Sequence, residues 1–248
     1  CVASGSTAPC GPGATGWTAV SDTSTPKALT GLQPNTAYDC YSAAVYNDGS
    51  ALNYVCSTLS AATLGWGLQT SAADNSWLGV TWGGPAGQEK FVAVASSGTG
   101  NRVMTSPDGV TWTSQFSATN RDWLGVTWGG PAGQEKFVAV ASSGTGNRVM
   151  TSPDGVTWTS QTSAANNDWR SVTWGGPAGQ ETFVAVADTG TGNRVMTSPD
   201  GVTWTLQTSA ADNSWRSVTW GGPAGQQKFV AVAASGTGNR VMTSATGL

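Results

Sequence analysis

The stretch NRVMTSPDGVTWT, from Asn101 to Thr113, recurs unchanged at residues 147–159 and 193–205, and a fourth copy begins at Asn239 and continues as NRVMTSATGL. Successive copies are 46 residues apart. The same spacing separates Trp77 from its three counterparts Trp123, Trp169 and Trp215. A period in the forties is typical of propeller blades, although some helical repeats share it, so the pattern inside the unit has to discriminate between them.

The unit contains four short strand-like segments separated by turn residues. The first of them, WLGVTWGG, alternates with a period of two, and the others are short runs that include β-branched residues: KFVAVASS (90–97), NRVMTS (101–106) and GVTWTSQ (109–115). Between them lie GGPAGQE, GTG and PDG, which break regular structure. No segment has the length or period of a helix. The sequence therefore predicts an all-β fold, a four-bladed β-propeller with blades of 46 residues.

The phase of the repeat predicts how the ring would close. Trp66 stands 11 residues before Trp77, just as Trp112 stands 11 residues before Trp123. We therefore expect Leu64–Gln69 to supply the fourth strand of the last blade, beside residues 239–244. This velcro closure would leave no open edge in the ring. The propeller is assigned to residues 65–248.

Residues 1–64 do not repeat and are assigned to a second domain. Two alternating runs, Tyr38–Tyr46 and Leu52–Leu59, flank the turn sequence NDGS and predict a β-hairpin. The segment also resembles the C-terminal half of a fibronectin type III domain, whose L-x-P-x-T-x-Y pattern is matched by Leu32, Pro34, Thr36 and Tyr38. The resemblance implies a partial β-sandwich, whose first strands would precede Cys1 or come from a neighbouring subunit.

All four cysteines, Cys1, Cys10, Cys40 and Cys56, lie in this first domain. An even number in a small segment predicts two disulfides and an oxidising compartment, with three pairings open. A zinc site is the rival, but the chain has no histidine and no C-x-x-C pair. A third interpretation is a lipoprotein-like N-terminal cysteine at Cys1, followed by a linker of small residues.

The amino-acid composition limits the classes of binding partner and the compartment that we expect. Only 10% of the residues are charged, against about 25% in ordinary soluble domains, which predicts a neutral polar surface typical of exported proteins. The net charge is −3 with 11 Lys and Arg, so no nucleic-acid partner is expected. No apolar run approaches the roughly 20 residues of a membrane span. We expect a bacterial protein that is extracellular or on the cell surface.

The sequence SPDGVTW resembles the Asp-box of sialidases and related propellers, written S-x-D-x-G-x-T-W. Here it is one residue shorter, because Gly109 follows Asp108 directly. In that family the motif lies between the third and fourth strands of a blade and is remote from the active site. We interpret the aspartates of the three copies as structural turn residues, because Asp accepts backbone hydrogen bonds and Gly adopts the left-handed conformation: Asp108, Asp154 and Asp200.

Catalytic constellations are not expected. Without histidine there is no Ser-His-Asp triad and no HExxH zinc motif. Sialidases use an arginine cluster, Tyr and Glu, but the repeat region has no Tyr, and its glutamates occupy equivalent turns at Glu89, Glu135 and Glu181. A two-carboxylate glycosidase needs its pair within about 5–10 Å. We therefore predict no catalytic residue, no metal and no cofactor, with a glycoside hydrolase or lyase as the disfavoured alternative.

Binding fits the loops better, because they are rich in residue types that stack on sugars or bond to hydroxyls. The candidate ligand-binding residues repeat once per unit: Trp82, Trp128, Trp174 and Trp220, with Asn101, Asn147, Asn193 and Asn239. The sequence predicts a non-catalytic adhesion protein whose propeller binds a glycan or a protein on a cell surface. The alternative is a structural subunit that self-associates into a filament or layer through the incomplete sandwich.

Overall fold

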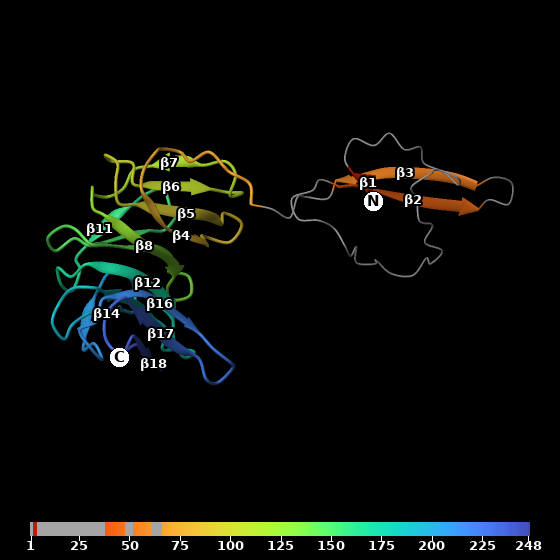
Figure 1. The fold of residues 1–248 in the computed structure, drawn as a ribbon. Helices are drawn as coiled ribbons and strands as arrows, with labels where there is room; N and C mark the ends of the chain where they lie inside the picture. The colour runs from red at the N-terminus through yellow and green to blue at the C-terminus, as the bar shows by residue number, and fades with distance from the viewer. Residues whose placement is uncertain (1, 4–37, 48–51, 61–65) are drawn as a thin grey trace. The chain divides into compact units, whose positions relative to one another are not determined.

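A computed structural model describes residues 2–3, 38–47, 52–60 and 66–248. The chain divides into two compact units, Cys1–Leu68 and Gln69–Leu248. Every regular element in the described ranges is a β-strand, so the all-β class is confirmed (Figure 1). None of the described residues forms a helix long and apolar enough to cross a membrane.

The described part of the first unit is an antiparallel sheet with the order β1-β2-β3. It consists of β1 (Val2–Ala3), β2 (Tyr38–Asn47) and β3 (Leu52–Ser60), which confirms the predicted hairpin. Cys40 is opposite Leu59 and Cys56 is opposite Ala43 in the β2–β3 register. Cys1, Cys10 and three of the four fibronectin-like positions lie outside the described residues, so the disulfides and the partial sandwich stay predictions.

The second unit consists of four antiparallel meanders, and the predicted 46-residue unit of four strands is seen complete in three of them. The first sheet contains β4 (Trp77–Gly83), β5 (Lys90–Ala95), β6 (Val103–Ser106) and β7 (Thr113–Gln115). The second contains β8 (Trp123–Gly129), β9 (Lys136–Ala141), β10 (Val149–Ser152) and β11 (Thr159–Gln161). The third contains β12 (Trp169–Gly175), β13 (Thr182–Ala187), β14 (Val195–Ser198) and β15 (Thr205–Gln207). The fourth has three strands, β16 (Trp215–Gly221), β17 (Lys228–Ala233) and β18 (Val241–Ser244).

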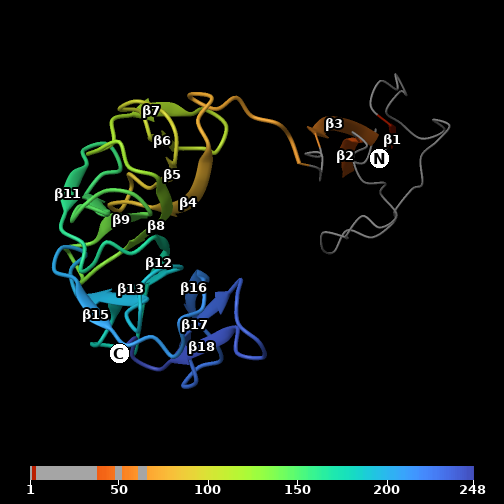
Figure 2. The ribbon, with the colours of Figure 1, turned by 60° about the vertical axis from the view of Figure 1, so that its left-hand side comes forward.

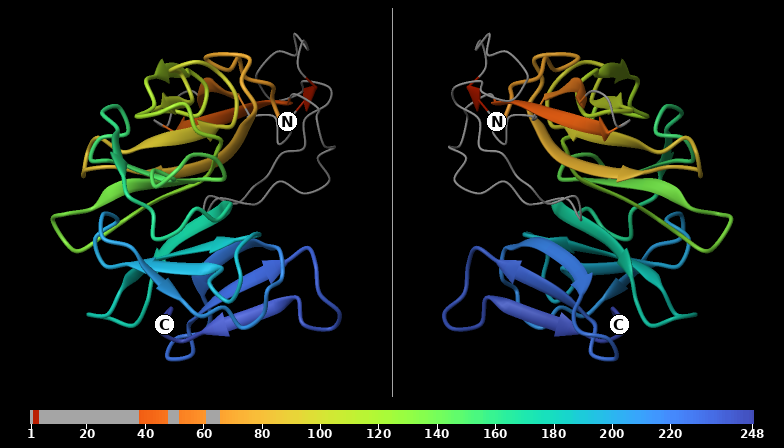
Figure 3. Two further views of the ribbon diagram at one scale, coloured as in Figure 1. Left: turned by 90° about the vertical axis from the view of Figure 1, so that its left-hand side faces the viewer. Right: turned by 90° about the vertical axis from the view of Figure 1, so that its right-hand side faces the viewer.

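The four sheets follow one another along an arc, with their first strands, β4, β8, β12 and β16, on its inner side (Figures 2 and 3). Neighbouring first strands approach closely because small residues face one another. A Cβ at Gly79 would lie 2.8 Å from the carbonyl oxygen of Leu124. The short third turn of each unit uses a left-handed glycine, such as Gly155 with φ of 76°.

Each sheet packs one face on the next, and the core is therefore divided among three similar junctions. At the first junction, valines from β5 and β6 pack on apolar side chains of the second sheet, and all of them are buried: Val92, Val94 and Val103 against Trp123, Val126, Phe137 and Met150. The second and third junctions repeat these contacts with the equivalent residues. The repeat is thus stabilised mainly by burial of apolar surface between units.

The predicted velcro closure is not seen: the repeat region is propeller-like, and its sheets are not closed into a ring. Residues 66–69 form no strand, Trp66 and Leu68 are fully exposed, and the sheet of β16 to β18 keeps three strands. Elsewhere the fourth strand has three residues and is joined to the third by a tight turn. Residues 66–69 have no such turn to β18. Ordering these residues beside β18 would cost about 1–2 kcal/mol of backbone conformational entropy per residue, and it would form very few backbone hydrogen bonds in return.

Candidate functional site

The aspartate of each SPDG turn is held by its own turn. In the second repeat, Asp154 Oδ1 accepts hydrogen bonds from the backbone N–H groups of Val156 and Thr157, both at 2.8 Å. Ser152 Oγ donates to the same oxygen at 2.9 Å and accepts from the N–H of Gly155 at 2.8 Å. Asp108 and Asp200 make the same contacts. One oxygen of each carboxylate is therefore occupied by its own turn, and the other lies 3.4 Å from the hydroxyl of the following threonine.

These hydrogen bonds favour the ionised carboxylates. Backbone N–H groups of Thr111 and Val110 and the hydroxyl of Ser106 lower the pKa of Asp108 to about 2. At Asp154 and Asp200, burial by itself would raise the pKa, but the equivalent hydrogen bonds outweigh it and lower the pKa below the ordinary value of 3.8. The hydrogen bonds of the turn therefore account for the lowered pKa of all three aspartates, and no second carboxylate contributes to these shifts.

The repeated arginines connect one sheet to the next. Arg148 Nε donates to the carbonyl oxygen of Gly144 at 2.8 Å, and its Nη1 donates to Ser142 O at 2.6 Å and to Asp168 Oδ1 at 2.7 Å. Arg102 makes the same set of bonds, ending on Asp122. These guanidinium groups are each occupied by their own junction, so they do not converge into a carboxylate-binding cluster.

The candidate asparagines lie in the loops between the second and third strands, beside the connectors that lead into the first strands. Asn75 Nδ2 donates to Asn101 O at 2.8 Å, and Asn167 and Asn213 hold Asn193 and Asn239 in the same way. In the second repeat the position of the donor asparagine is occupied by Arg121. The buried Oδ1 of Asn147 has no hydrogen-bond partner among the described residues. The asparagines are thus engaged chiefly with neighbouring loops.

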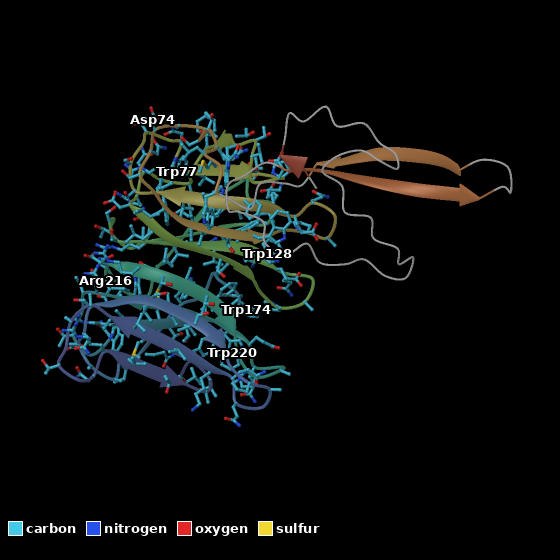
Figure 4. The ribbon with its side chains drawn as sticks, turned by 45° about the vertical axis from the view of Figure 1, so that its right-hand side comes forward. Asp74, Trp77, Trp128, Trp174, Arg216 and Trp220 are labelled. Atoms are coloured by element: carbon cyan, nitrogen blue, oxygen red, sulfur yellow. The ribbon has the colours of Figure 1, made fainter. Side chains whose placement is uncertain are left out.

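The candidate tryptophans form a row at the opposite end of the first strands. We call Trp82, Trp128, Trp174 and Trp220 the tryptophan row; Figure 4 labels the last three on successive strands. Each indole contacts a phenylalanine of its own sheet, with centroids 4.5–4.7 Å apart. The three labelled members also lie against a glycine of the preceding sheet: Gly83, Gly129 and Gly175. Trp82 is 50% exposed and the others are half-buried.

The structure therefore separates the two sets of candidate ligand residues. In the β4–β5 register, Trp82 is opposite Phe91, whereas Trp77, next to the asparagine loops, is opposite Ala95 at the other end. The tryptophan row has no asparagine partner from the candidate set. If the row binds a ligand, the polar contacts have to come from the adjoining exposed GPAGQ loops.

One charged cluster was not singled out by the sequence analysis. Asp188, which is largely buried, accepts a hydrogen bond from Arg170 Nε at 2.7 Å and lies 2.9 Å from Arg216 Nη1. The sequence does contain a signal for this cluster. The positions equivalent to Arg170 and Arg216 are leucines in the first two repeats, Leu78 and Leu124, and the position equivalent to Asp188 is a serine there. The cluster is found in the third and fourth repeats only and joins their sheets.

The glutamates of the repeat region occupy separate loops. Glu89, Glu135 and Glu181 are exposed in three equivalent loops, and the side chain of Glu181 accepts a hydrogen bond from Gly179 N–H at 3.0 Å. Within residues 66–248 and the described strands of the first unit, no three His, Cys, Asp or Glu side chains group as metal ligands would. The tryptophan row is thus the repeated surface feature that is best suited to binding.

Comparison with known proteins places no constraint on this site. No protein-family model matches the chain, and no curated protein matches it either.

Proposed function

We propose that this chain is a non-catalytic protein of the bacterial surface or the extracellular space, and that its repeat region is an interaction module that binds carbohydrate through the tryptophan row. The observation that carries the proposal is that the indole is partly exposed in every repeat, most of all Trp82 at 50%, although most side chains of the adjoining junctions are buried. A flat indole beside polar loop groups suits the apolar face and the hydroxyls of a sugar.

The other repeated polar groups support this choice by elimination. The aspartates of the SPDG turns and the arginines of the junctions are used in hydrogen bonds within and between repeats. In this proposal the repeats are Asp-box blades and residues 1–64 belong to a fibronectin type III-like sandwich closed by disulfides. Four equivalent sites that each bind weakly would gain affinity for a long glycan through avidity.

A glycan panel tests the proposal directly. The whole chain is titrated with neutral, sialylated and amino-sugar oligosaccharides up to millimolar concentration, and binding is followed by calorimetry. Replacing Trp128 and Trp174 with Leu together keeps apolar contact with the neighbouring phenylalanines but removes the flat indole faces. We expect this double variant to lose at least about tenfold in affinity.

The matched control is Arg216→Gln, because Arg216 and Trp220 lie near opposite ends of the same strand (Figure 4). It should bind as tightly as the unsubstituted chain. Absence of binding to the whole panel, or equal affinity of the double variant and the control, would overturn the proposal. Circular dichroism melts of all variants separate lost binding from lost folding.

The alternative proposal is a structural subunit of a surface filament or layer. It is favoured by β3, which has nine residues and is paired on one side only within the described sheet. Such an edge accepts a strand from another chain. Charged substitutions along β3 that leave assembly unchanged would contradict it.

A further inference from the structure

The first and last sheets of the repeat region expose the two halves of a junction that is built three times inside it. At internal junctions, the valines of the second and third strands are buried, as Val140 and Val149 are at 0% exposure. On the last sheet the equivalent Val232 and Val241 are 46% and 61% exposed. The receiving face is open on the first sheet, where Val80 is 62% exposed although its counterpart Val126 is 8% exposed.

Each half keeps the residue types of the internal junction. The last sheet presents three valines, and the first sheet presents the side chains that would receive them: Val230, Val232 and Val241 on one end, and Trp77, Val80, Phe91 and Met104 on the other. The third junction joins the same residue types: Val184, Val186 and Val195 with Trp215, Val218, Phe229 and Met242. The two ends therefore carry the two sets of residue types that meet at each internal junction.

The polar contacts of the junction are also divided between the ends. At the third junction, the N–H of Gly192 donates to Asp212 Oδ1 at 2.7 Å, and Arg194 Nε lies 3.6 Å from the same oxygen. The equivalent Arg240 is exposed on the last sheet and makes no ion pair with any described carboxylate; its Nε donates to Gly236 O. The equivalent of Asp212 on the first sheet is Asp74, which is exposed and lies in the same sequence, TSAADNSW. Opposite charges thus stand at matching positions.

A third opening lies beside β18. At earlier junctions the indole just before the fourth strand packs beside the phenylalanine of its sheet, as Trp158 does with Phe137, with ring centroids 6.4 Å apart. Beside β16 to β18 the corresponding space is a cavity of about 100 Å³ lined by Val218, Phe229 and Met242. Trp66 is fully exposed and precedes Trp77 by the same 11 residues that separate Trp158 from Trp169.

We propose that a second copy of this chain continues the repeat array head to tail. The first sheet of the second copy packs on the last sheet of the first, its Asp74 pairs with Arg240, and its Trp66–Gln69 segment adds as a fourth strand to β18. One occupant covers all three openings with contacts that the chain already makes three times. Because the two faces differ, the contact is heterologous and produces a closed ring or a growing filament, depending on the rotation per copy. The proposal does not rest on glycan binding.

Sedimentation velocity of the whole chain, from micromolar to millimolar concentration, tests the association. We expect the sedimentation coefficient to rise with concentration. Val80→Glu and Val232→Glu each place a charge on one end face and should raise the dissociation constant at least about tenfold. Trp66→Ser should also weaken association without changing the melting of the isolated chain. The control is Val202→Glu, since Val202 is exposed like its counterparts Val110 and Val156 and belongs to no junction.

A charge exchange tests the direction of the contact. In the Asp74→Arg variant two arginines face each other at every contact between copies, and in the Arg240→Asp variant two aspartates do. Each variant alone should therefore be a monomer. A mixture of these two variants restores opposite charges at every head-to-tail contact, so it should associate like the unsubstituted chain. The proposal is overturned if the chain is a monomer at all concentrations, if association is as strong in the Val80 and Val232 variants as in the control, or if the mixture stays dissociated.

Discussion

Arg148 Nη1 lies 2.7 Å from Asp168 Oδ1, and this contact connects the loop before β10 in one sheet to the connector that enters the next sheet. The side chains are 13% and 33% exposed, so the pair is more shielded than an ordinary surface salt bridge. Because the same arginine also donates to two backbone carbonyls, it orients the loop that carries it. The ion pair therefore adds polar specificity to a junction that is mainly apolar.

A double-mutant cycle should separate these contributions. We expect Arg148→Ala to lower the free energy of unfolding by about 2–3 kcal/mol, because the carbonyls of Ser142 and Gly144 lose their donor together with the ion pair. Asp168→Asn should cost less, and the coupling between the two positions should be about 1 kcal/mol. Urea unfolding of the two single variants and the double variant measures all three quantities. Additive losses would show that the ion pair itself contributes nothing.

The contact of Gly129 with Trp174 should be very sensitive to substitution. A Cβ at Gly129 would lie 2.3 Å from Trp174 Cγ and 2.4 Å from its Cβ, atoms that cannot move away without shifting the backbone. We expect Gly129→Ala to cost about 3 kcal/mol. Gly221 is the matched control, because it is the equivalent glycine of the last sheet and a Cβ there would meet nothing within 4 Å. Thermal melts of both alanine variants measure the difference, and equal melting temperatures would contradict the close packing.

The SPDG turns should make stability depend on pH in the acid range. The pKa of Asp108 is lowered to about 2, and the pKa values of Asp154 and Asp200 are also lowered from 3.8. A carboxyl with a depressed pKa in the folded state contributes stability above its unfolded pKa and loses it as pH falls through the folded value. We therefore expect the free energy of unfolding to fall as pH drops from about 4 towards 2.

The control for this prediction replaces all three aspartates with Asn, whose side-chain oxygen can still accept the turn hydrogen bonds but cannot titrate. Urea unfolding at several pH values compares the slopes. The triple variant should have the flatter profile between pH 4 and 2. The same slope in both proteins would show that the acid sensitivity comes from other carboxyls.

Much of the fold could be predicted because its signals are local. The alternation in WLGVTWGG and the glycine of the PDG turn specify a strand and a tight turn within a few residues, and β4, β8 and Gly155 occupy these places. The β2–β3 hairpin has the same kind of local signal in NDGS. The candidate site was less predictable, because the separation of the tryptophan row from the asparagine loops depends on strand register and on loops brought together by packing.

By itself, the sequence determined the period of 46 residues, the all-β class and the order of short strands, since turn chemistry and period-two alternation act between near neighbours. The tertiary structure alone decided that Trp128 lies against Gly83, that Arg148 reaches Asp168, and that the sheets form an open arc with two unlike ends. Identical repeats contain both halves of every junction, so a single copy cannot reveal which halves remain unpaired. That outcome depends on whether packing outweighs the entropy of ordering residues 66–69 beside β18.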